Sequence, residues 1–349
     1  MKKNNRLLIL IVVILVIWNV ILTVVLANKQ EKEINQTNIN ETVVTGFSTD
    51  LTKVIEQTKS SVVVIETNNA LSSGFIYSSN NGSTYVVTTC HSVSDTSYLN
   101  VVFASGASYD AKIVGKDIFA DIAVLQVDSN VEVTPVKLGN SDLLKDGEFL
   151  VCIGTPKNIQ YSYSNEMSIV ASKLRTIINS VEFNDEQYEY YTNIIQLSSD
   201  VSEGYSGSPI INMNGEVQGI ITMKDDTAVF ALPINEVKIV VDNIIDEKEY
   251  AKIQFGYKGT LVSGLENYEK NQLNIPLDVI SGLYINNVRS AGIASSAGLK
   301  IGDVLLSING IDIKSYSDLL NIEYTNADTF EFVVNRNNEE IVLAGSIND

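Results

Sequence analysis

Short apolar runs rich in Val, Ile, Tyr and Thr recur along most of this chain, and they restrict the fold more than any other feature of the sequence. Such residues favour strands, and polar turns at 79–83 and 104–107 separate neighbouring runs. A first group of runs occupies residues 62–66, 73–77, 84–89, 98–103, 110–114 and 122–127, and a second group occupies 148–154, 167–172, 192–197, 209–211, 217–222 and 228–233. Regular short strands of this kind predict a mainly β protein built around a β-barrel.

Helical spacing of apolar residues marks the ends of the strand-rich part. It predicts a short helix over residues 51–59 and a second helix over 235–246. A chain of 349 residues is too long for one ordinary domain, so we expect two. We assign residues 51–247 to the first domain and 253–345 to the second.

The N-terminus has the pattern of a membrane anchor. Residues 1–6 form a basic tail, and residues 7–27 carry no charge. At about 1.5 Å per residue, a helix over 7–27 reaches about 31 Å, the thickness of the bilayer hydrocarbon. A cleaved signal peptide is the alternative, because residues 25–27 loosely fit a cleavage site, but its apolar core is usually only about 7–15 residues long.

Either interpretation of the N-terminus places both domains on the same side of the membrane. Positive residues stay on the cytoplasmic side, so both domains are expected outside the cytoplasm. With the anchor retained, we expect a single-pass protein of the cell membrane. Residues 28–50 are polar and lack an apolar pattern, which predicts a linker between the membrane and the first domain.

Composition excludes several kinds of partner. The formal net charge of −18 gives no electrostatic reason to bind nucleic acid, which requires a basic surface. With one histidine and no Cys-x-x-Cys pair, we expect no metal site, and we expect no cofactor. Cys90 and Cys152 lie in apolar strand contexts, where buried free thiols are a simpler interpretation than a disulfide.

A serine between two glycines lies within the second group of strands. Residues 204–208 read Gly-Tyr-Ser-Gly-Ser and separate a polar turn from the apolar run that begins at Pro209. A serine nucleophile requires a base to remove its proton and backbone N–H groups to receive the charge that develops on the substrate carbonyl. Glycines permit the tight turn that exposes those N–H groups. Because plain surface turns have the same composition, Ser206 by itself is only a candidate nucleophile.

The single histidine supplies a base for that serine. His91 follows a β-rich run, and Asp121 stands 30 positions later at the start of an alternating apolar strand. A lone histidine is more often a packed or surface residue, but imidazole is the usual general base near neutral pH. The chain order His91, Asp121, Ser206 is that of the chymotrypsin arrangement, which favours a catalytic triad.

Several motifs occur in a specific order and carry a family resemblance. They are Ser-Gly-Phe-Ile-Tyr at 73–77, Val-Val-Thr-Thr-Cys-His at 86–91, the run at 113–125 that ends in Ala-Asp-Ile-Ala-Val-Leu, Leu-Gly-Asn-Ser-Asp at 138–142, Cys-Ile-Gly-Thr-Pro at 152–156 and Gly-Tyr-Ser-Gly-Ser-Pro at 204–209. With them, the chain from about residue 50 to 345 resembles the HtrA/DegP-type trypsin-like serine proteases. Tyr205 and Ser208 replace the family's usual Asn and second Gly, and Cys90 directly precedes the histidine.

The resemblance implies a chymotrypsin-like double β-barrel with His91, Asp121 and Ser206 across its cleft. It further implies that the N–H groups of Gly204 and Ser206 form the oxyanion hole. Substrate would pair with the strand that contains Ile221, Thr222 and Met223 and borders the specificity pocket. Residues 179–191 are expected to form an exposed loop, which in this family helps to switch the oxyanion site, although an inert surface loop is an equal alternative.

The second domain resembles a PDZ domain. Residues 291–310 contain Ala-Gly-Leu-Lys-Ile-Gly-Asp followed by an apolar run and an Asn-Gly turn. The resemblance implies that residues 255–261 supply a carboxylate-binding turn and a peptide-binding strand, and that 317–324 form the helix beside it. The implied peptide-binding residues are Tyr257, Lys258, Gly259 and Thr260. Lys258 and Thr260 stand at positions that are usually apolar in the family.

Together these features predict a membrane-anchored serine endopeptidase that hydrolyses unfolded or misfolded extracytoplasmic proteins, with a preference for a small or medium apolar residue before the cleaved bond. Its PDZ domain would bind C-terminal peptides, and the resemblance extends to a homotrimer. An esterase that uses the same triad is one alternative. A catalytically silent, membrane-anchored PDZ adaptor is the other, because Ser208 departs from the family pattern.

Overall fold

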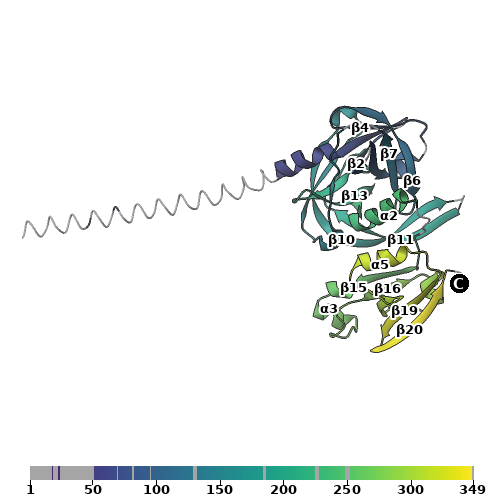
Figure 1. The fold of residues 1–349 in the computed structure, drawn as a ribbon. Helices are drawn as coiled ribbons and strands as arrows, with labels where there is room; N and C mark the ends of the chain where they lie inside the picture. The colour runs from purple at the N-terminus through teal and green to yellow at the C-terminus, as the bar shows by residue number, and fades with distance from the viewer. Residues whose placement is uncertain are drawn as a thin grey trace, which may run out of the picture. The chain divides into compact units, whose positions relative to one another are not determined.

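The chain is seen here as a computed structural model (Figure 1). It describes residues 18, 23, 51–68, 70–80, 82–94, 96–128, 132–183, 186–224, 228–247 and 252–347. Most of the predicted anchor at 7–27 and all of the predicted linker at 28–50 lie outside these residues. Within the described part of the chain, no helix combines the length and the apolar character needed to cross a membrane. Residues 51–58 are helical, close to the predicted 51–59.

The first group of predicted strands forms one seven-stranded antiparallel sheet with the order β5-β4-β1-β2-β3-β7-β6. Its strands are β1 (Val62–Thr67), β2 (Leu71–Asn80), β3 (Ser83–Thr89), β4 (Leu99–Phe103), β5 (Ser108–Asp110), β6 (Lys112–Asp117) and β7 (Ile122–Asp128). Fully buried Val63, Ile65, Ile76 and Val86 belong to its core. Consecutive residues of β1 and β7 are buried, so the β-branched runs of the sequence pack on both faces of these two strands.

The second group forms another seven-stranded sheet, with the order β12-β9-β10-β11-β14-β13-β8. Its strands are β8 (Lys137–Leu138), β9 (Phe149–Gly154), β10 (Ser164–Phe183), β11 (Glu186–Leu197), β12 (Pro209–Asn212), β13 (Glu216–Lys224) and β14 (Val229–Pro233). An additional pairing of β12 with β13 closes six of these strands into a barrel, and β8 pairs with β13 outside the ring. The sheet is thus the predicted β-barrel, and its core contains Leu150, Cys152, Ile195 and Ile210.

The segment 179–191 is not the exposed irregular loop that we expected. It belongs to a long hairpin in which β10 and β11 pair continuously from Ile177 opposite Thr192 to Phe183 opposite Glu186. Both arms contain residues that favour strands, including Ile177, Ile178 and Val181 in one arm and Tyr190, Tyr191 and Thr192 in the other. Tyr190 in this hairpin is almost fully buried.

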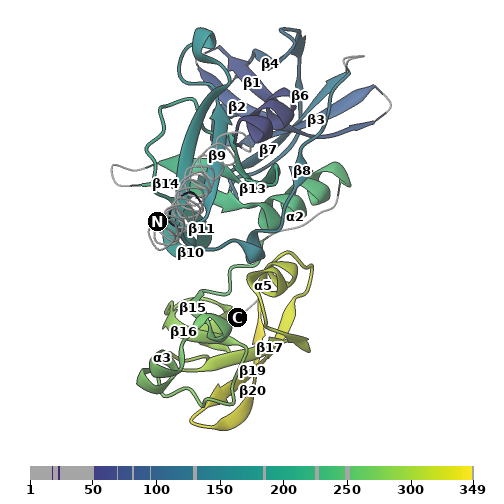
Figure 2. The same cartoon turned by 90° about the vertical axis from the view of Figure 1, so that its left-hand side faces the viewer.

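Helix α2 (Ile234–Ile245) follows β14 and packs on β6, β7 and β13 in the first domain (Figures 1 and 2). It agrees with the predicted helix at 235–246. A Cβ atom placed on Gly115 in β6 would lie 2.7 Å from Ile244 Cγ2, so glycine permits the close contact of helix and strand. Both cysteines, Cys90 and Cys152, are buried and free.

The second domain contains a smaller sheet in the order β15-β16-β17-β19-β20, with β18 beside β17. Its elements are β15 (Tyr257–Leu261), α3 (Asn267–Gln272), β16 (Leu283–Val288), α4 (Ile293–Ser296), β17 (Val304–Ile308), β18 (Ile311–Asp312), α5 (Tyr316–Glu323), β19 (Thr329–Arg336) and β20 (Glu339–Ser346). Helix α5 corresponds to the predicted helix at 317–324. Phe255 contacts Phe330 and Phe332 edge-on in the core of this domain.

The segment that enters the second domain is held by a buried ion pair. The Lys252 ammonium group binds the carboxylate of Glu236, and both side chains are at most 5% exposed. The hydroxyl of Tyr324 donates a 2.9 Å hydrogen bond to the same carboxylate. Because Glu236 belongs to α2 and Tyr324 follows α5, this cluster joins the two domains.

Candidate active site

Ser206 lies in the turn that precedes β12, with its side chain partly exposed. The glycines on either side adopt positive φ angles, +99° at Gly204 and +84° at Gly207. A Cβ atom on Gly207 would lie 1.9 Å from the carbonyl oxygen of Ser73 in β2. Glycine is therefore required at position 207, both for the left-handed backbone and for contact with the first sheet.

His91 begins a short 3₁₀ turn, η2 (His91–Val93), directly after β3. Its backbone N–H donates to Asp121 Oδ1 at 2.9 Å, and its Nδ1 lies 2.7 Å from Asp121 Oδ2. The carboxylate can only accept, so Nδ1 carries the proton and donates it in the hydrogen bond. This bond leaves the Nε2 lone pair of neutral His91 free to accept a proton.

Asp121 is held in a conformation that few residues other than glycine adopt, with φ of +55°. The N–H of Cys90 donates to the Asp121 carbonyl oxygen at 3.0 Å, and the two bonds from His91 fix its carboxylate. Strained backbone of this kind costs of order 1–3 kcal/mol and is found most often at functional sites. This backbone conformation and the two bonds from His91 together hold the Asp121 carboxylate against the imidazole.

The third contact completes the arrangement. Nε2 of His91 lies 3.1 Å from Oγ of Ser206, across 115 residues of sequence. The hydrogen bond with Asp121 raises the pKa of His91 above its ordinary value, and partial burial opposes this shift. The geometry brings together the three residues that the sequence nominated, in the order carboxylate, imidazole and hydroxyl.

Two backbone donors lie beside Ser206. Within the described residues, the N–H groups of Gly204 and Ser206 have no hydrogen-bond partner. The carbonyl oxygens of the same two peptide groups are engaged, because Glu203 O accepts from Lys157 N–H at 3.1 Å and Tyr205 O accepts from Ser208 N–H at 2.9 Å. In a trans peptide the N–H points opposite to the C=O, so both N–H groups face away from these partners.

The predicted substrate strand divides into a buried and an accessible part. The N–H and C=O of Ile221 are bonded to Ser208 and Gly207, and its side chain is buried. The pairing of β13 with β14 changes register between Ile221 and Met223, with Thr222 at the irregularity. The structure therefore places Thr222 and Met223, but not Ile221, on the accessible surface near His91.

Two recesses flank His91. One, of about 570 Å³, is lined by Ser206, Gly204, Leu71 and Lys157 together with His91. The other, of about 280 Å³, reaches from His91 and Asp121 along Thr222 and Met223 to the β10–β11 hairpin. Its remaining walls are mainly apolar and include Ile118, Phe119, Ala120, Val181, Ile194 and Leu232. An extended chain that crosses Ser206 thus has room for side chains on both sides of His91.

The predicted peptide-binding residues of the second domain lie on β15, which is an edge strand. Tyr257 and Gly259 are buried, Lys258 is partly exposed and Thr260 is exposed. The Thr260 hydroxyl accepts a 2.8 Å hydrogen bond from Asn286 on the neighbouring strand β16.

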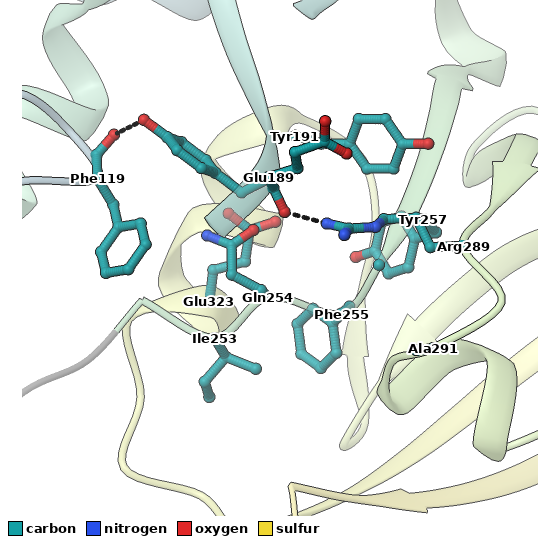
Figure 3. Close-up of a pocket in the computed structure, with 12 residues that line it drawn as sticks. Phe119, Glu189, Tyr191, Ile253, Gln254, Phe255, Tyr257, Arg289, Ala291 and Glu323 are labelled. Atoms are coloured by element: carbon teal, nitrogen blue, oxygen red, sulfur yellow. Dashed lines mark hydrogen bonds between the residues drawn. The ribbon is translucent and has the colours of Figure 1, made fainter. Parts of the chain in front are cut away.

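A cavity of about 260 Å³ lies between the start of β15 and the β10–β11 hairpin (Figure 3). Residues 254–256 line it, and their N–H groups have no partner within the described part of the chain. Arg289 donates from Nη1 to the carbonyl oxygen of Glu189 across this cavity. Residues 255 and 256 belong to the expected carboxylate-binding turn, whereas Arg289 was not expected here because no motif marks it.

Comparison with known proteins agrees with this architecture. The family model of the trypsin-like peptidase domain matches residues 72–220, which include His91, Asp121 and Ser206, and the PDZ domain model matches residues 284–334. The chain is 31% identical to the serine protease Do-like HtrA of Lactobacillus helveticus over 280 residues, which cover 77% of this chain and 66% of the relative. It is 32% identical to the protein of the same name from Bacillus subtilis over 289 residues, covering 79% of this chain and 63% of the relative.

A third relative and a solved structure extend the comparison. The periplasmic serine endoprotease DegP of Salmonella typhimurium is 33% identical over 256 residues, which cover 72% of this chain and 50% of DegP. The chain thus spans between half and two thirds of these relatives. The solved structure of the HtrA-type protease AlgW with a tripeptide superposes with a TM-score of 0.57 at 22% identity, covering 84% of this chain and 95% of AlgW. At this identity the likeness establishes the fold alone.

Proposed function

We propose that this chain, which belongs to the HtrA/DegP-type trypsin-like serine proteases with a PDZ domain, is a serine endopeptidase that cleaves unfolded or misfolded extracytoplasmic polypeptides. One observation carries the proposal: Asp121, His91 and Ser206 form a continuous hydrogen-bonded relay, with distances of 2.7 Å and 3.1 Å. A neutral serine hydroxyl becomes a nucleophile only when a base removes its proton, and this arrangement places His91 as that base.

The first half of the reaction forms an acyl-enzyme. Ser206 Oγ attacks the carbonyl carbon of the peptide bond, and its proton moves to His91 Nε2. The carbonyl oxygen becomes an oxyanion, which accepts hydrogen bonds from the N–H groups of Gly204 and Ser206. Asp121 stabilises the imidazolium that results. When the C–N bond breaks, His91 Nε2 returns the proton to the leaving amine, and the acyl group stays on Ser206.

The second half repeats these steps with water. His91 removes a proton from the water molecule as its oxygen attacks the acyl carbon, and the same two N–H groups stabilise the second oxyanion. Breaking the bond to Ser206 Oγ then transfers the proton from His91 to that oxygen. The products are a carboxylic acid and the restored enzyme, so the cycle needs no metal ion or cofactor.

Substrate selection is part of the proposal. The recess between His91 and the β10–β11 hairpin has mainly apolar walls, which favours polypeptides with apolar side chains near the cleaved bond. A small or medium apolar residue immediately before that bond is our expectation. Unfolded proteins expose such residues, whereas folded proteins bury them.

The PDZ domain would bind the C-terminus of a polypeptide. The N–H groups of residues 254–256, which have no partner among the described residues, and the guanidinium group of Arg289 lie at one cavity, where they are suited to a carboxylate. An extended peptide would then add to the free edge of β15. Membrane anchoring through residues 7–27 and assembly into a homotrimer complete the proposal.

Covalent labelling tests the proposed activity. The full-length chain in detergent should react with a peptidyl diphenyl phosphonate that carries an apolar side chain, and mass spectrometry should find the adduct on Ser206. Ser206→Ala should abolish labelling, whereas Ser105→Ala, in the exposed turn between β4 and β5, should leave it unchanged. The wild type should also cleave peptide substrates. Cleavage of esters alone would favour the esterase, and peptide binding without labelling or cleavage would favour the adaptor.

A further inference from the structure

Ser73 is a fully buried residue of β2 that makes four hydrogen bonds to the segments around Ser206 and His91. Its N–H donates to the carbonyl oxygen of Ser206 at 2.9 Å, and its own carbonyl oxygen accepts from the Thr88 hydroxyl at 2.7 Å. Its hydroxyl donates to the carbonyl oxygen of Gly204 at 2.9 Å and accepts from the N–H of Thr155 at 2.9 Å. One side chain of the first sheet therefore holds two segments of the second.

These contacts fix the peptide group between the two proposed oxyanion donors. The carbonyl of Gly204 belongs to the peptide that follows the Gly204 N–H and precedes the Ser206 N–H in the chain. Gly204 has φ of +99°, and without a Cβ atom its backbone rotates more freely than that of any other residue. The bond from the Ser73 hydroxyl removes this freedom by fixing the direction of the Gly204 carbonyl.

The side chain of residue 73 makes two hydrogen bonds that require a hydroxyl group. The side chain must donate to a carbonyl and accept from an N–H at the same atom, which a hydroxyl does. Alanine would leave the Thr155 N–H and the Gly204 carbonyl without this partner in a buried place. The carbonyl oxygens on either side of Gly204 already have other donors, because Glu203 O accepts from Lys157 N–H and Tyr205 O accepts from Ser208 N–H.

The neighbouring strand adds a link to the base. Thr88, which donates to the Ser73 carbonyl oxygen, lies on β3 three residues before His91. The Ser73 N–H bonds the carbonyl of Ser206 itself. Ser73 therefore contacts both the strand that leads to His91 and the turn that carries Ser206.

We propose that Ser73 is a positioning residue that keeps the Gly204 and Ser206 N–H groups directed at the developing oxyanion. The inference rests on the proposed serine-protease function. Ser73 has no exposed surface and does not touch substrate, so it acts through the oxyanion turn. Its loss weakens binding of the tetrahedral transition state and leaves ground-state binding of the peptide unchanged.

The test measures steady-state kinetics of the full-length wild type, Ser73→Ala and Thr84→Val on one peptide substrate. For the same three proteins it also measures the affinity for a peptidyl boronate, which forms a tetrahedral adduct with the nucleophilic serine. Removing a complete oxyanion donor costs about 10²–10³ in kcat, so loss of its positioning bond should lower kcat by roughly 10- to 100-fold. KM should stay within about twofold, and boronate affinity should fall by the same factor as kcat/KM. Thr84→Val, which removes a buried hydroxyl bonded to Ser79 elsewhere in the first sheet, should change none of these.

A second variant separates positioning from folding. Ser73→Cys keeps a weaker donor and acceptor at the same place, so its kcat should lie between those of the wild type and Ser73→Ala. Far-UV circular dichroism would establish that each variant is folded. Unchanged kcat in folded Ser73→Ala, a rise in KM alone, or failure of both variants to fold would each overturn the inference. A wild type that neither cleaves peptides nor binds the boronate would instead contradict the proposed function, and the inference would fall with it.

Discussion

Gly154 at the end of β9 lies directly beneath the side chain of Tyr205, the residue before the nucleophile. A Cβ atom placed on Gly154 would lie 2.6 Å from Tyr205 Cδ1 and 2.2 Å from Ser208 Oγ. Tyr205 and Ser208 are the two departures from the family motif, and both point into the core of the second sheet. Their side chains do not enter the space beside Ser206, so the unusual motif is compatible with the active arrangement.

Gly154→Ala should therefore lower both the stability of the fold and the catalytic rate. The added methyl group would push Tyr205 and Ser208 towards Ser206, which should destabilise the fold by about 1–3 kcal/mol and lower kcat. Thermal unfolding and peptide hydrolysis would measure the two effects. Gly264→Ala is the matched control, because no atom lies within 4 Å of its added Cβ. Equal behaviour of the two variants would contradict the close contact.

Ser208→Gly should have a small effect. A residue that precedes proline is biased towards extended backbone with a negative φ, and Ser208, which precedes Pro209, is not among the residues with positive φ. The backbone of Ser208 is therefore not strained. Glycine should cost about 0.4–1 kcal/mol through the unfolded chain, and removal of a buried hydroxyl that has no partner within the described residues should offset part of this cost. The catalytic rate should change by less than about tenfold, or 1.4 kcal/mol of barrier. A large gain of activity from a nearly silent wild type would favour the adaptor.

The pH dependence of activity should follow His91. Its hydrogen bond with Asp121 raises its pKa above the ordinary value of 6.5. Protonated His91 cannot accept the proton of Ser206, so kcat/KM should be low in acid and rise with pH through a pKa above 6.5. Asp121→Asn should shift this rise to lower pH and reduce kcat by about 10⁴, the loss seen when a triad carboxylate is replaced. A profile that Asp121→Asn leaves in place would exclude His91 as the titrating group.

Tyr190 supports the triad from the β10–β11 hairpin. Its hydroxyl donates to the Phe119 carbonyl oxygen at 2.8 Å, two residues before Asp121, and its ring meets the Phe119 ring edge-on. Tyr190→Phe should cost about 1 kcal/mol of stability and lower kcat several-fold by loosening this turn. Tyr191→Phe should have less effect, because the Tyr191 hydroxyl bonds at 3.3 Å to exposed Asn287. The comparison uses thermal unfolding and kinetics, and a larger effect of Tyr191→Phe would argue against this role.

The strands, and the contacts of His91 with Asp121 and Ser206, could be predicted from the sequence because their signals are local or unique. Periodic β-branched runs marked the strands, and one histidine left a single choice of base. The β10–β11 hairpin was missed because its polar residues resemble a loop, whereas pairing across the hairpin decides its structure. The hydrogen bonds of Ser73 could not be predicted for a similar reason, because its partners lie between 15 and 133 positions away in the sequence. Register also decided that Ile221 is buried, and no pattern in the sequence fixes the break at Thr222.

His91 is proposed to activate Ser206 for peptide hydrolysis, and comparison of kcat/KM between His91→Ala and the wild type on one peptide substrate tests this role. Half of the His91 side chain is exposed, so the variant should fold normally, as circular dichroism would establish. We expect kcat/KM to fall by about 10⁴-fold or more, as in other triads that lose their base. A folded variant that retains more than about a tenth of the wild-type value, a barrier change under 1.4 kcal/mol, would contradict the account.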